Sequence, residues 1–179
     1  AIMTLDLGNT DKLADFKQEL NHLNVPLLLP DINKSNVRFT VEKAADAPEY
    51  QDEELGELMP EDARLHQGVR YALAAIKGVG EKAMESIVAE REENGPFKDL
   101  IDFAERIDPK VLNKRQIENL ASAGAFSTIH DDRASAHKAA EIVMRVAQMV
   151  TQERESAQVS LFGGEEGVVD RQTMTQIGR

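Results

Sequence analysis

The sequence contains no cysteine and no tryptophan, and only 4% of its residues are aromatic. The absence of cysteine excludes a disulfide scaffold, a metal site built on thiolates and a catalytic thiol. It also fits a reducing compartment, so we expect a cytoplasmic location. With 179 residues, the chain is long enough for one ordinary domain or two small ones.

Long hydrophobic runs are missing too. No stretch approaches the roughly 18 consecutive apolar residues that a membrane span needs, so we expect no membrane partner. The first residues, Ala1 to Asp6, carry no basic region ahead of an apolar stretch, as a secretory signal would. Because position 1 is alanine, we expect the sequence to be part of a longer chain.

Positive charge is scarce, since 21 lysines and arginines face 32 aspartates and glutamates and leave a net charge of −11. Taken alone, such a balance argues against nucleic acid as a partner. The charge is uneven, however, because residues 42–62 hold nine of the acids and a single base. With Pro48 and Pro60 inside it, we interpret this segment as a solvated acidic loop. From Lys77 to Arg115, eight bases and nine acids nearly balance.

The first third of the chain predicts one helix and two short strands. Residues 10–24 predict an amphipathic helix with four apolar side chains on one face. These side chains are Leu13, Phe16, Leu20 and Leu23. Residues 25–30 predict a short buried extended segment, and residues 30–35 have the composition of a turn. Residues 37–41 and 68–72 predict two strands, which could pair as a hairpin around the acidic loop.

From residue 73 onward the chain predicts helices separated by breaking residues. The expected helices are 81–93, 98–107, 114–123 and a long helix from 131 to about 154. Gly95–Pro96 ends the first and Asp108–Pro109 ends the second. Asn113 is expected to cap the third, with Gln116 completing a capping box.

One segment has the pattern of a helix-hairpin-helix. Gly78 and Gly80, separated by the apolar Val79, predict a tight turn between two short helices. The amide N–H groups at the start of the second helix would point outward and bind an anion, aided by the helix dipole. Lys77 and Lys82 flank the turn and add charge for a phosphate. We therefore predict sequence-independent DNA binding, and the alternative is an ordinary turn whose glycines serve geometry alone.

A second, degenerate copy of this pattern is predicted at residues 112–115. There too a turn leads into a helix N-terminus, and Asn113, Lys114 and Arg115 would face phosphates. The alternative at this place is a capped helix whose lysine and arginine are simply solvated.

In their order along the chain, several motifs resemble the catalytic alpha subunit of bacterial DNA polymerase III. The matching stretches are 6–13, 29–35, 73–81, 95–97, 102–106, 113–115 and 123–126. The resemblance runs from residue 1 to about residue 162. It departs from the family pattern at Ala72, where glycine is usual, and at residues 119–122, where the family is more apolar.

The resemblance implies that the chain is a fragment of a DNA-directed DNA polymerase, a nucleotidyltransferase of DNA replication. In that family a helix-hairpin-helix region follows the fingers domain and holds the primer–template duplex, and other holoenzyme subunits are partners. Catalysis there uses palm-domain aspartates and two Mg²⁺ ions. This sequence lacks those aspartates, and its four histidines have no ligand spacing. We predict no catalytic residue, metal site or cofactor in this chain, although the full polymerase would need Mg²⁺.

The C-terminal tail contains one apolar motif in polar surroundings, Gln158-Val159-Ser160-Leu161-Phe162. An exposed Leu-Phe pair in a flexible tail is unusual unless a partner covers it. The motif resembles the short sequence with which this family binds the sliding clamp. By that resemblance, Leu161 and Phe162 would be the buried anchors. Gln158 would make polar contacts, Val159 a lesser apolar contact and Ser160 a backbone hydrogen bond. The alternative is that Leu161 and Phe162 fold back onto the long helix.

Together these patterns predict a mainly α fold of short helices with tandem helix-hairpin-helix motifs, plus a small β-hairpin from the end of the fingers. The expected parts are the fingers end (1–41), the acidic loop (42–67), the tandem hairpin region (68–130), the long helix (131–155) and a flexible tail with the clamp motif (156–179). A different function is also compatible with the hairpins, namely a stand-alone helix-hairpin-helix accessory protein of DNA repair or recombination.

Overall fold

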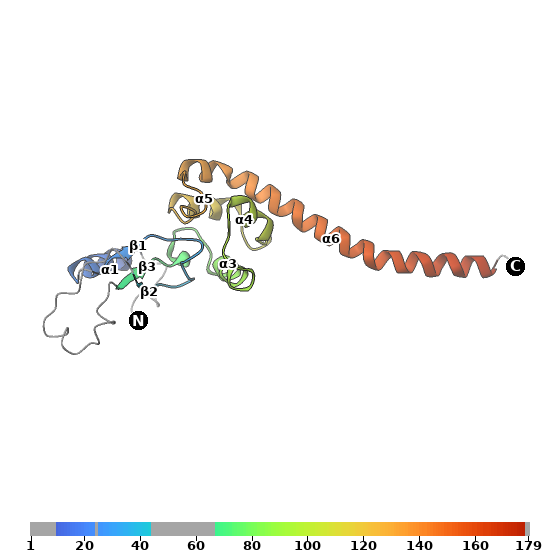
Figure 1. Cartoon of the computed structure of the whole chain (residues 1–179), viewed down its shortest axis with the longest axis horizontal. Helices are drawn as coiled ribbons and strands as arrows, with labels where there is room; N and C mark the ends of the chain where they lie inside the picture. The colour runs from blue at the N-terminus through green and yellow to red at the C-terminus, as the bar shows by residue number, and fades with distance from the viewer. Residues whose placement is uncertain (1–9, 24, 44–66, 178–179) are drawn as a thin grey trace.

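A computed structural model describes residues 10–23, 25–43 and 67–177, with only the backbone given for residues 10, 11 and 162–177. Its elements are α1 (Thr10–His22), β1 (Leu27–Leu28), β2 (Thr40–Lys43), β3 (Gln67–Arg70), the 3-10 helix η2 (Leu73–Ala75), α3 (Glu81–Asn94), α4 (Leu100–Arg106), α5 (Lys114–Ser122) and α6 (Arg133–Ile177). In Figure 1, α1 and the strands lie at one end, α3 to α5 in the middle, and α6 extends away to the other end. The fold is mainly helical with a small sheet, as the sequence predicts.

The three strands form one sheet in the order β1-β3-β2. Strands β2 and β3 pair antiparallel, with Thr40 opposite Arg70, so the predicted hairpin is confirmed. On the other edge of β3, β1 pairs in parallel, with Leu27 opposite Val69. The extended segment predicted at residues 25–30 contains β1, but its pairing with β3 was not predicted, and Leu27 and Leu28 are half-buried rather than buried. Most of the predicted acidic loop, residues 44–66, lies outside the described residues.

Both strands predicted for the hairpin are displaced along the chain. The first was expected at residues 37–41, but β2 begins only at Thr40. The reason is that the carbonyls of Asn36 and Val37 accept hydrogen bonds from the N–H groups of Leu73 and Ala74, at 2.9 and 3.2 Å. Residues 36–37 are therefore bound to η2, and only the residues after them are free to pair with β3.

The apolar face predicted for the first helix is largely confirmed. Leu20 is buried and Leu13 and Phe16 are half-buried, whereas Leu23 is 50% exposed. Leu23 follows the last residue of α1, His22, so it no longer lies on the helical face.

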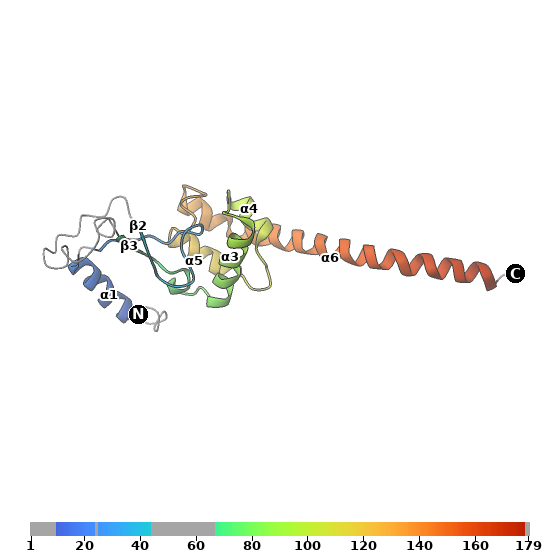
Figure 2. The same ribbon diagram turned by 60° about the horizontal axis from the view of Figure 1, so that its bottom comes forward.

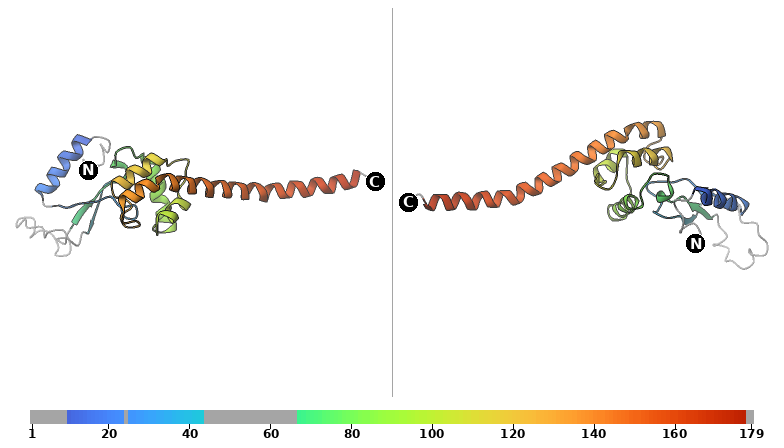
Figure 3. Two further views of the ribbon diagram at one scale, coloured as in Figure 1. Left: turned by 90° about the horizontal axis from the view of Figure 1, so that it is seen from above. Right: turned by 180° about the vertical axis from the view of Figure 1, so that it is seen from behind.

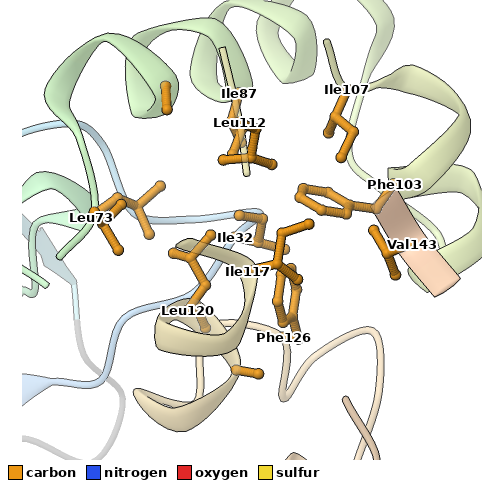
Figure 4. Close-up of a cluster of buried hydrophobic side chains, with 14 of the residues drawn as sticks. Ile32, Leu73, Ile87, Phe103, Ile107, Leu112, Ile117, Leu120, Phe126 and Val143 are labelled. Carbon is orange, nitrogen blue, oxygen red and sulfur yellow. The ribbon is translucent and has the colours of Figure 1, made fainter. Parts of the chain in front are cut away.

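The hydrophobic core lies among α3, α4, α5 and the first half of α6 (Figure 2). In Figure 4, Phe103 of α4 and Ile117 of α5 point toward the same centre, beside Phe126 and Leu112. The rings of Phe103 and Phe126 meet edge to face with centroids 5.1 Å apart, a favourable aromatic geometry. The buried residues of α3, α4 and the turns beside them include Val79, Ala83, Ile87, Val88, Phe103, Ala104 and Ile107, whereas Leu100 is half-buried.

The segment before the sheet's second strand also packs into this core. Ile32 is fully buried there, and its N–H donates to the carbonyl of Ala125 at 2.7 Å. Asn33 exchanges two hydrogen bonds with the backbone of Phe97, both 2.8 Å long. Arg91 of α3 donates to the carbonyls of Ile32 and Ser35 at 2.9 and 2.8 Å. The structure therefore joins residues 30–36 to the helical region, although the sequence-based division assigned them to a separate part.

The long helix differs from its prediction at its end. A flexible tail was expected from residue 156, but α6 continues through this segment to Ile177. Residues 152–161 are exposed, and they meet other elements through polar contacts, from Arg154 to the Glu105 carbonyl and from Glu155 to Lys110. They contain no proline and include the good helix formers Glu, Ala and Gln, so local propensity favours the helix there. Figure 3 shows this half of α6 standing clear of the other elements.

Within the described residues, no helix combines the length and the apolar character that crossing a membrane requires.

Candidate nucleic-acid interface

The first predicted hairpin consists of η2, the turn that follows it and α3. Gly78 takes a left-handed conformation with φ of 76°, as the tight turn requires. Val79 is 8% exposed and belongs to the core, so it anchors the turn as predicted. The first of the two short helices predicted around the turn is the three-residue 3-10 helix η2.

The start of α3 offers unpaired donors and positive charge. Gly80 is the residue before the helix and no side chain caps it, so no side chain satisfies the first amide N–H groups of α3. Lys77 and Lys82 are exposed, and neither forms an ion pair or hydrogen bond with any residue that the structure describes. The one acid in the first turn, Glu81, lies 3.7 Å from the guanidinium of Arg38, which offsets part of its charge.

The second predicted hairpin repeats the first 33 positions later. It runs from α4 through a turn into α5, and its residues take the same places in the structure. The corresponding pairs are Lys77 and Lys110, Val79 and Leu112, Gly80 and Asn113, Lys82 and Arg115, Met84 and Ile117, and Ile87 and Leu120. Both members of each apolar pair are buried. The two hairpins therefore have buried apolar residues at the same positions, and each has a cation as the second residue of its helix.

The second hairpin begins its helix differently. The side chain of Asn113 accepts a hydrogen bond from the N–H of Gln116 at 3.0 Å, and the Gln116 side chain accepts one from the N–H of Asn113 at 2.9 Å. The predicted capping box is therefore present. Asn113, which the sequence also placed among the DNA-binding candidates, uses its side-chain oxygen to start α5.

Two cations of the second hairpin are already paired with acids of α6. Lys114 lies 3.2 Å from Glu141, and Lys110 lies 2.8 Å from Glu155. The hydrogen bond from Lys110 to Glu155, followed by the carboxylate's negative charge, raises the pKa of Lys110 above its ordinary value. Arg115 is exposed and has no partner among the described residues. The second hairpin thus offers one unpaired cation where the first offers two.

The structure brings the two hairpins together. A Cβ added at Gly78 would come within 2.5 Å of the Asn119 side chain, and one added at Gly80 within 3.1 Å of the Gln116 side chain. Both contacted residues belong to α5, so the turn before α3 lies against α5. The starts of the two helices, with Lys82 and Arg115, therefore share one region of the surface.

Sequence reasoning missed the inter-hairpin contact and one supporting residue, Arg106. Its Nε donates to Glu90 at 2.9 Å and its Nη1 to Asp102 at 3.1 Å, while its guanidinium lies 4.4 Å from the centre of the Phe97 ring. A hydrogen bond from the Lys98 N–H, and then the hydrogen bond and charge of Arg106, lower the pKa of Asp102. This network joins the C-terminal part of α3 to α4.

The predicted clamp-binding motif lies on the projecting half of α6. Gln158, Val159, Ser160 and Leu161 are exposed, with Val159 at 72% and Leu161 at 77%. Leu161 therefore does not fold back onto the body, which was the alternative from sequence. The Phe162 side chain lies outside the described part of the chain.

Comparisons with known proteins agree with the hairpin geometry. The family described as the helix-hairpin-helix motif matches residues 24–136. A protein of Caulobacter vibrioides named DNA polymerase III subunit alpha is 42% identical over 167 residues, which cover 93% of this chain and 13% of that protein. Proteins of the same name from Pseudomonas aeruginosa and Vibrio cholerae are each 34% identical, over 92% and 91% of this chain. The chain spans only 12–13% of the length of these relatives.

Proposed function

Because this chain belongs to the family of the DNA polymerase III alpha subunit, and within it to the helix-hairpin-helix region, we propose that it holds duplex DNA without reading its sequence. The main support for this proposal is that two helix N-termini lie close together. The N-termini of α3 and α5 share one surface, and Lys77, Lys82 and Arg115 beside them have no partner among the described residues.

Backbone phosphates are the ligand that this surface suits. Amide N–H groups at a helix start and the positive end of the helix dipole favour an anion, and lysine and arginine add charge. Such contacts position a duplex but carry no base information. Two helix starts on one surface would contact backbone phosphates of the duplex and leave its bases unread.

The DNA proposal is tested by reversing the charge at the first hairpin. We expect the double variant Lys77→Glu, Lys82→Glu to bind a duplex at least about tenfold more weakly, because two phosphate contacts become repulsive. Fluorescence anisotropy with a labelled duplex measures this.

A matched control reverses two exposed lysines at the end of the molecule that holds α1 and the strands, Lys17 on α1 and Lys43 on β2. This control carries the same change in net charge. Equal losses in the two double variants would mean that only overall charge matters, and the hairpin would no longer account for DNA binding.

The relatives also support a role as part of a replicative polymerase. They are named as DNA polymerase III alpha subunits, and their similarity extends over more than nine tenths of this chain, well beyond the hairpins. A stand-alone repair or recombination factor with one shared motif would not be expected to match so fully. We propose DNA-directed nucleotidyl transfer in the cytoplasm, with other holoenzyme subunits, as the activity of the whole protein.

The part of this chain in that activity is to position DNA. A polymerase of this kind uses Mg²⁺ held by carboxylates. Among the described residues, no three His, Asp or Glu side chains are grouped as a metal site would need. The residues described here do not fit Mg²⁺, and we derive no catalytic step from them.

We further propose that residues 158–162 bind the sliding clamp. Exposed Val159 and Leu161 on a helix without neighbours support this, because apolar side chains gain most from a partner's pocket. Gly163 and Gly164 follow directly, and each glycine costs a helix about 1 kcal/mol relative to alanine. The motif could therefore leave its helical form at low cost when the clamp binds.

The clamp proposal is tested with the double variant Leu161→Ala, Phe162→Ala. We expect it to lose co-precipitation with the clamp while it keeps the thermal unfolding temperature of the wild-type chain, since Leu161 contacts no other element. A control with Gln152→Ala and Glu153→Ala, exposed residues earlier on α6, should still co-precipitate. Clamp binding that survives in the Leu161, Phe162 variant would contradict the assignment.

A further inference from the structure

Two amide side chains of α5 lie in the seam where the hairpins meet, which we define by Gly78, Gly80, Gln116 and Asn119. Asn119 lies over Gly78 and Gln116 lies over Gly80, in the space that a larger residue at either glycine would fill. Gln116 and Asn119 are three positions apart on one helix, so they lie on the same face. Both are half-buried and so remain partly open to solvent.

These amides have donors that the protein does not use. The oxygen of Gln116 accepts the N–H of Asn113 in the capping box, which leaves its Nε2 group without an acceptor among the described residues. The side chain of Asn119 makes no hydrogen bond to any described residue. Neither amide nitrogen is among the fully buried unpartnered atoms of the described residues, so both donors are open to a ligand that approaches the surface.

We propose that Gln116 Nε2 and Asn119 Nδ2 bind a backbone phosphate of the duplex in this seam. The inference rests on the proposed DNA binding and adds a contact between those at the two helix starts. A phosphate offers several acceptor oxygens, and hydrogen bonds to a charged group are stronger than those to a neutral one. Gln116 also lies in the first turn of α5, where the helix dipole favours an anion.

Under this proposal, Gly78 and Gly80 also make room for the amide side chains of α5. Without side chains at Gly78 and Gly80, the amides of α5 approach the backbone of the first turn closely. The seam then presents uncharged donors next to the start of α3, the helix whose second residue is Lys82. It recognises the sugar–phosphate backbone and adds no preference for base sequence.

The variant Gln116→Glu separates binding from folding. Glutamate serves a capping box as well as glutamine does, and a negative charge in the first helical turn is favourable. A purely structural role therefore predicts an unchanged or higher unfolding temperature and no specific effect on DNA. The proposal predicts the same stability but a duplex affinity about tenfold lower, because a donor to phosphate becomes a repelling carboxylate.

The matched control is Gln152→Glu, the same chemical change at an exposed position of α6. All variants are made in the 179-residue chain and compared by fluorescence anisotropy at one salt concentration. Asn119→Asp is the second test and should also weaken binding more than the control. If Gln116→Glu and Asn119→Asp weaken binding no more than Gln152→Glu, the seam contact is wrong. If the lysine double variant also binds DNA like the wild type, the proposed function itself fails and the seam contact fails with it.

Discussion

At the scale of single residues, Gly78 combines a backbone constraint with a steric one. Its φ of 76° disfavours any side chain, and a Cβ there would come within 2.5 Å of Asn119. Gly95 has a φ of 86° with a ψ of 174°, a conformation open essentially only to glycine, but nothing lies within 4 Å of the place of its Cβ. The backbone alone therefore constrains Gly95, whereas Gly78 also meets a neighbouring side chain.

This pair makes a prediction about stability. Gly95→Ala should lower the free energy of unfolding by about 2–3 kcal/mol, because its φ of 86° and ψ of 174° suit essentially only glycine. Gly78→Ala should cost about 1–2 kcal/mol, since the end of the Asn119 side chain can move aside. Urea unfolding followed by circular dichroism measures both. A larger loss at Gly78 than at Gly95 would show that Asn119 constrains the turn rigidly.

At the scale of elements, the two hairpin helices start in different ways. Gly80 leaves the first amides of α3 uncapped, whereas Asn113 caps α5. The difference matters for function, because an uncapped start offers more free N–H groups to a ligand. The cations near the two helix starts also differ. Lys114 at the start of α5 is paired with Glu141, whereas Lys82 at the start of α3 has no partner among the described residues. We therefore expect the first hairpin to bind DNA more strongly than the second.

The capping role of Asn113 is tested at the level of its helix. Asn113→Ala should lower the free energy of unfolding by about 1 kcal/mol, because one hydrogen bond at the start of α5 is lost. Asn113→Asp should keep that stability, since aspartate caps as well as asparagine. Thermal unfolding of both variants checks this, and a stable Asn113→Ala variant would mean that packing alone starts the helix.

Most helices could be predicted from the sequence because their signals are local. The bounds of α3 and α5 agree with prediction within one residue, since Gly95, the capping box and the apolar spacing all lie within a few positions of them. The bounds of the strands were harder to predict from the sequence. Backbone bonds from η2 to Asn36 and Val37 displaced β2, and no local pattern indicates such a distant partner.

At the scale of the whole molecule, net charge and binding surface must be considered together. The chain carries a net charge of −11, and this charge repels DNA at long range. The candidate interface counters this with three unpaired cations, Lys77, Lys82 and Arg115, and with amide donors that carry no net charge. Isolated affinity should consequently be low.

The same balance predicts the dependence of binding on salt. With about three phosphates neutralised, the logarithm of the association constant should fall against the logarithm of salt concentration with a slope of about −3. Anisotropy titrations between 50 and 200 mM salt, about the range over which such effects are large, measure it. The variant Lys77→Glu, Lys82→Glu should flatten this slope. A slope near zero in the wild type would contradict phosphate binding altogether.

The sequence by itself determined the helices, their caps, the Gly78–Gly80 turn and the family, because each depends on residue types at short or ordered spacings. Tertiary structure alone decided that β1 joins the sheet, that Ile32 lies in the helical core and that α6 pairs with the lysines of the second hairpin. It also decided that Gly78 meets Asn119. These contacts join segments far apart in the chain, and their energy depends on how whole elements pack. Composition and periodicity describe each element alone, so they could indicate two DNA-binding hairpins but not the seam between them.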